Sequence, residues 1–132
     1  MIYTDMADGI SSCLTSAGMN CYPEFHSGKI PTKMQFCTVG IKSAKLSSKG
    51  IDSSGEIFAN CECAVRVTFF RRGISEMAFH KAVESSIVTP LLLWSGDILS
   101  TEVGTASYDK NLDMLKCEVI VVFKGIAGVV QS

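Results

Sequence analysis

The clearest pattern in the chain is an alternation of apolar and polar positions between Glu56 and Phe70. Every second residue is apolar, and most of the residues between them are polar; Phe58 and Phe70 are the exceptions. The apolar set is Ile57, Ala59, Cys61, Cys63, Val65, Val67 and Phe69. Alternation over this length predicts a long strand with one face against a hydrophobic core.

A helix is predicted directly after this strand. The segment 71–73, Arg-Arg-Gly, is a turn signal, and Ser75 is a candidate N-cap. Apolar residues then recur at helical spacing, at Phe79, Ala82, Val83 and Ile87. We expect this helix to lie back on the sheet. Pro90 kinks or ends it, which leaves residues 91–94, Leu-Leu-Leu-Trp, to pack on the core.

The amino-terminal part of the chain predicts one more helix and a short strand. Residues 3–17 have apolar positions at helical spacing, and Gly18 is well placed as a left-handed stop. Residues 20–25 are expected to form an edge strand, because Pro23 has no N–H to give to a central ladder.

Three further segments complete the predicted sheet. Residues 34–46 and 114–124 alternate well enough to be long strands, and 98–108 is a more weakly patterned third. The Ser- and Gly-rich segment 47–55 is expected to be an exposed hairpin loop. Residues 125–132 are expected to be a tail that frays unless a neighbour holds it.

These elements predict an α+β fold. The sheet is mostly antiparallel, with two long hairpins and a short edge strand, and both helices pack on one face. We expect a single domain over residues 1–132, globular over 1–125, with a tail at 126–132 that a partner subunit orders.

Composition adds an expectation of self-association. The chain has 132 residues, of which 47% are hydrophobic and only 19% charged. A small protein this short of charge often covers surface with a partner, although scattered surface apolar residues are the alternative. The net charge of −1 leaves no basic footprint for nucleic acid. We expect no membrane-spanning segment and no signal peptide, and hence a protein made in the cytoplasm.

Six cysteines raise two alternatives to simple packing. Without a secretory signal, three disulfides are not expected. Cys61 and Cys63 are too closely spaced for a common zinc motif, although a four-thiolate site with Cys37 and Cys117 is conceivable. We expect the cysteines to be small core residues, with no metal and no cofactor.

No known catalytic motif is present in the sequence. His26 and His80 have no acidic or thiol partner at a known catalytic spacing, and Gly28-Lys29 lacks the rest of a phosphate-binding loop. We therefore expect a protein that is not an enzyme. A site assembled only by folding is the remaining catalytic alternative.

The order of helix, short strand, hairpin, helix and hairpin resembles the tail terminator and head–tail joining proteins of tailed bacteriophages and related phage-tail-like particles. The resemblance extends from Met1 to about Gly125. It implies a homo-oligomeric, hexameric ring that caps the tail tube and connects it to the neck or head. It also implies contacts with tube, sheath or neck proteins in a virion or phage-tail-like particle assembled in the bacterial cytoplasm.

Two sets of residues are candidates for these contacts. The subunit-interface candidates are Phe58, Phe70, Ile120 and Val122, apolar residues at outward positions. The tail-partner candidates, in the predicted loop and turn, are Lys49, Asp52, Arg71 and Arg72. The alternative functions are a small α+β enzyme or ligand-binding protein, or a monomeric assembly adaptor.

Overall fold

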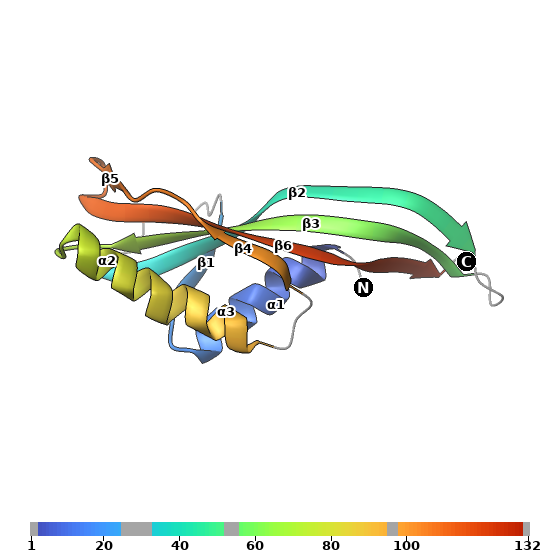
Figure 1. Cartoon of the computed structure of the whole chain (residues 1–132), viewed down its shortest axis with the longest axis horizontal. Coiled ribbons are helices and arrows are strands. Elements are labelled where there is room, and N and C mark those ends of the chain that lie inside the picture. The colour runs from blue at the N-terminus through green and yellow to red at the C-terminus, as the bar shows by residue number, and fades with distance from the viewer. Residues whose placement is uncertain (1–2, 25–32, 52–55, 95–97, 131–132) are drawn as a thin grey trace.

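The computed structural model describes residues 3–24, 33–51, 56–94 and 98–130, with the backbone alone described at 47–51, 56–59 and 126–130 (Figure 1). The elements in chain order are α1 (Tyr3–Ser16), β1 (Cys21–Pro23), β2 (Gln35–Ile51), β3 (Glu56–Arg71), α2 (Glu76–Val83), the π-helical turn η1 (Glu84–Val88), α3 (Thr89–Leu93), β4 (Ile98–Val103), β5 (Ser107–Asp109) and β6 (Met114–Val130).

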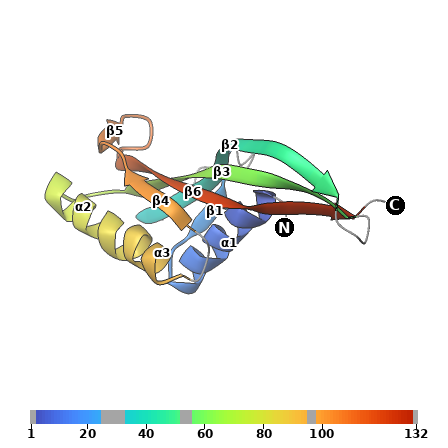
Figure 2. The ribbon, with the colours of Figure 1, turned by 45° about the vertical axis from the view of Figure 1, so that its right-hand side comes forward.

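The sheet confirms the predicted α+β class. Its strand order is β1-β2-β3-β6-β4, and β5 pairs with β6. Only β1 runs parallel to its neighbour β2; the other described pairs are antiparallel. The helices lie on one face of the sheet, as expected (Figures 1 and 2). Pro23 lies on the edge strand β1, where its missing N–H leaves no gap in a central ladder.

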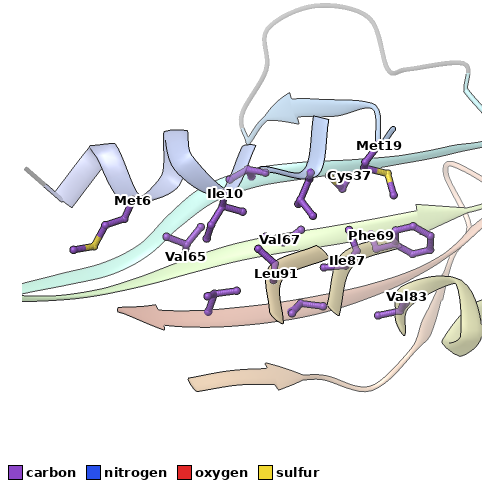
Figure 3. Close-up of a cluster of buried hydrophobic side chains, with 14 of the residues drawn as sticks. Met6, Ile10, Met19, Cys37, Val65, Val67, Phe69, Val83, Ile87 and Leu91 are labelled. Carbon is purple, nitrogen blue, oxygen red and sulfur yellow. The ribbon is translucent and has the colours of Figure 1, made fainter. Parts of the chain in front are cut away.

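The core lies between the helices and the inner face of the sheet (Figure 3). The alternating residues of β3 predicted to face inward are fully buried at Val65, Val67 and Phe69. Residues from α1, α2, η1 and α3 cover them, namely Met6, Ile10, Leu14, Phe79, Val83, Ile87 and Leu91. Cys37, Cys61, Cys63 and Cys117 are buried in the same core, which confirms that they pack as small hydrophobes.

Both predicted helices are present, and their ends follow the sequence signals. Gly18 has φ 96°, the left-handed conformation expected just after α1. The Ser75 Oγ accepts a hydrogen bond of 3.3 Å from the backbone N–H of Ala78, which confirms the N-cap.

The second helix does not end at Pro90. It continues to Leu93, and the π-helical turn η1 comes directly before the segment that contains the proline. Proline has no N–H and its ring crowds the carbonyl four residues earlier, so a widened turn accommodates it. Leu92 and Leu93 are 71% and 82% exposed. The prediction that residues 91–94 pack on the core was therefore wrong for these two, although Leu91 is buried and Trp94 packs against the core. Three consecutive helical residues cannot all face one side.

Three predicted strand boundaries were also wrong. The segment 98–108 is two short strands, β4 and β5, with an interruption at 104–106; the Gly104 N–H still donates to Glu118 O at 2.8 Å, so the chain leaves the ladder after this residue. In contrast, 47–51 and 125–130 are strand rather than loop and tail. Both pair with the start of β3, since Ile51 lies opposite Ile57 and Val130 opposite Glu56.

These longer strands form an extension that we call the arm. It consists of residues 47–51 of β2, 56–60 of β3 and 126–130 of β6. Figures 1 and 2 show the arm projecting beyond the helices, with no helix of the described part of the chain over either face. No helix among the described residues is long and apolar enough to cross a membrane.

Candidate interaction surfaces

The sheet face turned away from the helices, which we call the outer face, has no helix over it in the described residues (Figures 1 and 2). Its residues are the alternate set that the core does not use. On the two central strands they are Ala64, Arg66, Thr68, Phe70, Lys116, Glu118, Ile120 and Val122. All are at least partly accessible.

An ion-paired cluster lies at the centre of the outer face. Arg66 Nη1 donates to Glu24 Oε1 at 3.0 Å, and Arg66 Nε lies 3.7 Å from Glu118 Oε1. The side chains of Arg66 and Glu24 are 29% and 16% exposed. Glu24 can reach Arg66 because it lies over Gly40, where an added Cβ would be 2.6 Å from the Glu24 Cβ. Glycine is thus required at position 40 because Glu24 lies so close to the backbone that no Cβ fits between them.

This cluster lines a hollow of about 440 Å³ on the outer face. Thr38, Thr68, Ser107 and Lys116 also line it, together with Phe70, so its wall is both polar and apolar. Arg66 Nε and Glu24 Oε2 are buried atoms with no hydrogen-bond partner in the described structure. Both atoms are shielded from solvent, and Arg66 Nε still faces Glu118 Oε1 in the ion pair.

Ile120 and Val122 form an apolar strip beside this cluster. Ile120 lies between Arg66 on β3 and Glu102 on β4, and Val122 lies between Ala64 and Ser100. Both residues are partly exposed. The structure thus brings these two predicted interface residues together on a face with no helix, beside small or polar neighbours.

The other two interface candidates lie elsewhere. Phe70 stacks on Phe36 with ring centroids 4.7 Å apart, and Tyr22 meets Phe36 edge-on. One side of the Phe70 ring is thus used within the chain. Phe58 lies on the arm opposite Gly50 and Gly128, and its side chain is outside the described residues.

The tail-partner candidates are also dispersed. Arg71 donates to Gln35 Oε1 at 3.2 Å, and Arg72 donates to Leu112 O at 3.0 Å, so both half-buried side chains help to fix their own turn. Lys49 lies on the arm opposite Ala59 and not on a loop, and nothing is described of its side chain. Asp52 lies outside the described residues.

A second apolar surface was missed by the sequence analysis. Leu92 and Leu93 on α3, Met77 on α2 and Leu99 and Val103 on the edge strand β4 are all exposed. Between helix and strand lies a groove of about 430 Å³ that Val88, Leu92 and Val103 help to line. The run of three leucines was a signal for it, because a helix turns 100° per residue and must expose part of such a run.

No metal site is evident in the described part of the chain, where no three His, Cys, Asp or Glu side chains are grouped to hold an ion. The conceivable four-thiolate site with Cys37, Cys61, Cys63 and Cys117 is therefore not formed. His80 is half-buried and lies 4.0 Å from Glu76 on the same helix, while His26 is outside the described residues.

Comparisons with known proteins show a likeness to solved structures. No protein-family model and no curated protein sequence matches the chain. The chain is similar to a sheath/tube terminator of an extracellular contractile injection system, PVC, seen by cryo-EM in the extended state. The TM-score is 0.49 at 13% identity, and the match covers all of this chain but 62% of that one. A TM-score below 0.5 at this identity does not establish a common fold.

Proposed function

We propose that the chain is a structural subunit of a phage tail or phage-tail-like particle. Copies of it form a closed, hexameric ring that caps the tail tube and connects it to the neck or head, without catalytic chemistry or a cofactor. The order of elements behind the resemblance is retained, with α1, the β2–β3 hairpin, the second helix and the strands around β6 in that sequence. One observation carries the proposal: the sheet is far longer than the helix layer.

The lengths of the elements make this mismatch plain. A 17-residue strand such as β2 or β6 is roughly 55 Å long. The 14-residue α1 is roughly 21 Å long, and the helix from Glu76 to Leu93 is about 27 Å. One end of the sheet and the whole outer face therefore lie beyond reach of the helices. Strands left in this way are usually covered by a partner or protected against pairing.

The two sides of the sheet differ, which favours a ring over a symmetric dimer. One edge is formed by β4, with the exposed apolar residues Leu99 and Val103. The opposite edge is formed by β1 and β2, with the exposed Lys42 and Lys45. A contact between unlike surfaces repeats from copy to copy, and it closes into a ring when the rotation allows. In this proposal Ile120 and Val122, with Phe58 and Phe70, contribute to the contact between copies.

The arm is the proposed contact for tail partners. Lys45 on β2 and Lys124 on β6 flank Glu62 of β3 in register, so the base of the arm is basic on both sides. If two arms paired edge to edge, Lys45 of one copy would lie beside Lys124 of the other, and the two like charges would repel. The edges of the arm therefore favour pairing with an acidic strand of a tube, sheath or neck protein. Lys49 and Asp52 remain candidates for that contact, and the Arg71–Arg72 turn, at the opposite end of β3, is a candidate for a separate contact.

The oligomeric mass tests this proposal. Light scattering on a size-exclusion column is expected to give a mass near six times 14.2 kDa for the wild-type chain. Ile120→Asp places an unpaired charge in the contact between copies and is expected to release monomers, since a buried unpaired charge costs several kcal/mol. Ser85→Asp, an exposed position on the opposite side of the molecule, is the matched control and is expected to keep the oligomer.

Two outcomes would contradict the ring or the proposed contact between its subunits. The wild-type chain could remain monomeric at high concentration, or Ile120→Asp could keep the same mass as Ser85→Asp while both have a wild-type circular dichroism spectrum. The first result would favour a monomeric adaptor or the second candidate, and the second would show that copies do not meet through Ile120.

The second candidate function is binding of a small ligand in the hollow around Arg66. The volume of the hollow, about 440 Å³, and the charged side chains of Glu24 and Arg66 that line it favour this function. A monomer whose melting temperature rises with a small molecule carrying both a carboxylate and an amine would support this function, and Arg66→Met should abolish the rise.

A further inference from the structure

Two cysteines from adjacent strands are in direct contact at the edge of the sheet. Cys21 on β1 lies opposite Cys37 on β2, and their Sγ atoms are 3.3 Å apart. Both are free thiols; Cys37 is fully buried and Cys21 is half-buried. Two hydrogen bonds of 2.9 Å hold the register on either side, from Cys37 N–H to Asn20 O and from Glu24 N–H to Val39 O.

The backbone at this position already fits a covalent bond. Neighbouring strands lie about 4.8 Å apart, within the Cα separation of about 4.4–6.8 Å that disulfides accept. Cys21 and Cys37 thus need only side-chain rotation to approach bonding distance.

The two thiols also differ chemically. The Cys37 thiol donates to the Cys21 sulfur, and this hydrogen bond lowers the pKa of Cys21 to about 7, with a smaller lowering from Thr15. The same bond and burial raise the pKa of Cys37. Cys21 is therefore the nucleophilic cysteine at neutral pH, and Cys37, which stays protonated beside it, is the resolving cysteine.

We propose that Cys21 and Cys37 are a dithiol site that closes to a disulfide by exchange with a small disulfide of the glutathione type. The Cys21 thiolate attacks one sulfur of the small disulfide, whose S–S bond breaks and releases one thiolate. Cys37 then loses its proton to that thiolate or to water and attacks the Cys21 sulfur, which releases the second small thiol. The protein loses two protons and two electrons, and the small disulfide is reduced to two thiols.

Closure would bind the edge strand covalently to the sheet. β1 is held by only three paired positions, Cys21 to Pro23, and α1 leads directly into it. The disulfide would close the segment between Cys21 and Cys37 into a loop, which restricts the unfolded chain and raises stability. The inference does not depend on the proposed ring, because it concerns contacts within one chain.

Exchange in glutathione buffers tests the site. The wild-type chain is equilibrated at stepwise falling ratios of reduced to oxidised glutathione, quenched in acid, alkylated and weighed. The expected product is lighter by two hydrogens and has lost two alkylation sites. Trypsin cuts after Lys29 and Lys33, so the linked peptides are 1–29 and 34–42. A Cys13→Ser background removes the other cysteine of the first peptide.

The reactivity of Cys21 gives an independent readout. With a pKa near 7, about half of Cys21 is thiolate at pH 7, against about 3% of an ordinary thiol. A thiolate of lower pKa is intrinsically less nucleophilic, and this reduces the gain from the larger thiolate fraction by about a factor of five. Cys21 should therefore alkylate about three-fold faster in the wild type than in Cys37→Ala. Cys117→Ala is the matched control, because Cys117 and Cys37 flank Phe69 on opposite sides and are equally buried.

Three results would overturn the proposal. The wild type could form a disulfide between Cys13 and Cys21 within peptide 1–29, with no link to peptide 34–42. The wild type could retain a glutathione adduct on Cys21 or remain fully reduced in the most oxidising buffer. Cys21 could also alkylate at the same rate in the wild type, Cys37→Ala and Cys117→Ala. The wild-type exchange needs no variant, so a misfolded Cys37→Ala chain would leave the first two tests intact.

Discussion

Replacing Gly40 by alanine tests whether the geometry of the outer face is as described. A Cβ at this position would lie 2.6 Å from both the Cβ and the carboxylate carbon of Glu24. No ordinary contact is that short, and the Glu24 Cβ is too near its own backbone to move away cheaply. Glu24 must therefore shift, and its 3.0 Å bond to Arg66 must lengthen or break.

The size of the effect follows from three contributions. Forcing a methyl group into a packed site costs about 1–3 kcal/mol. Weakening a hydrogen bond between charged groups costs about 1.5–3 kcal/mol, and the low end applies because Arg66 is partly exposed and keeps Glu118 nearby. In the opposite direction, alanine has fewer conformations than glycine in the unfolded chain, which stabilises the folded state by about 0.4–1 kcal/mol. We expect Gly40→Ala to lower the free energy of unfolding by about 2–3 kcal/mol.

A double-mutant cycle in urea, followed by the fluorescence of Trp94, separates this mechanism from a general effect of the strand. Glu24→Ala alone is expected to cost about 1.5–3 kcal/mol, for the reason just given. In the double variant Glu24→Ala/Gly40→Ala, most of the Glu24 side chain that would clash with the added Cβ is absent, and the ion pair with Arg66 is already lost. The double variant should therefore be no less stable than Glu24→Ala. If the two single effects instead add to within about 0.5 kcal/mol, Glu24 does not lie over Gly40.

Three further predictions concern local features. Ser75→Ala should lower the free energy of unfolding in urea by about 1 kcal/mol, and Ser75→Asp should restore it, because either side chain caps α2. Gly18→Ala should cost about 1–2 kcal/mol through its positive φ alone, since an added Cβ meets nothing within 4 Å. The free energy of unfolding should rise from pH 7 to about 8.5, because Cys21 is ionised in this range in the folded chain but not in the unfolded chain. It should fall at higher pH, because the thiols of the unfolded chain then ionise while the raised pKa of Cys37 keeps that thiol protonated in the folded chain. Urea titrations at each pH should show this maximum flattened in Cys37→Ala.

The sequence predicts those parts of the fold that depend on local periodicity. Alternation in β3 places Val65, Val67 and Phe69 on the core side because side chains of a strand point to opposite faces in turn. Gly18 and Ser75 mark helix ends because their conformations and hydrogen bonds involve residues close in sequence. The outward position of Ile120 and Val122 follows in the same way from the inward residues on either side of them.

The remaining features depend on residues that are far apart in sequence. Glu24 reaches Arg66 over Gly40 only because β1 lies beside β2 in parallel, and no pattern within 20–25 specifies that orientation. The contact between Cys21 and Cys37 has the same origin. The length of the arm was underestimated because Ser and Gly in 47–55 are typical of loops, whereas pairing with β3 extends the strand.

The distribution of charge separates the two kinds of contact that the proposed ring requires. Arg66 lies between two carboxylates, so the centre of the outer face is neutralised within the chain, and the whole chain has a net charge of only −1. Copies that meet through Ile120 and Val122 therefore repel each other weakly, and salt has little to screen. The base of the arm has two lysines around one glutamate in register, so its attraction for an acidic partner weakens with ionic strength. The ring should thus persist at salt concentrations that release its tail partners.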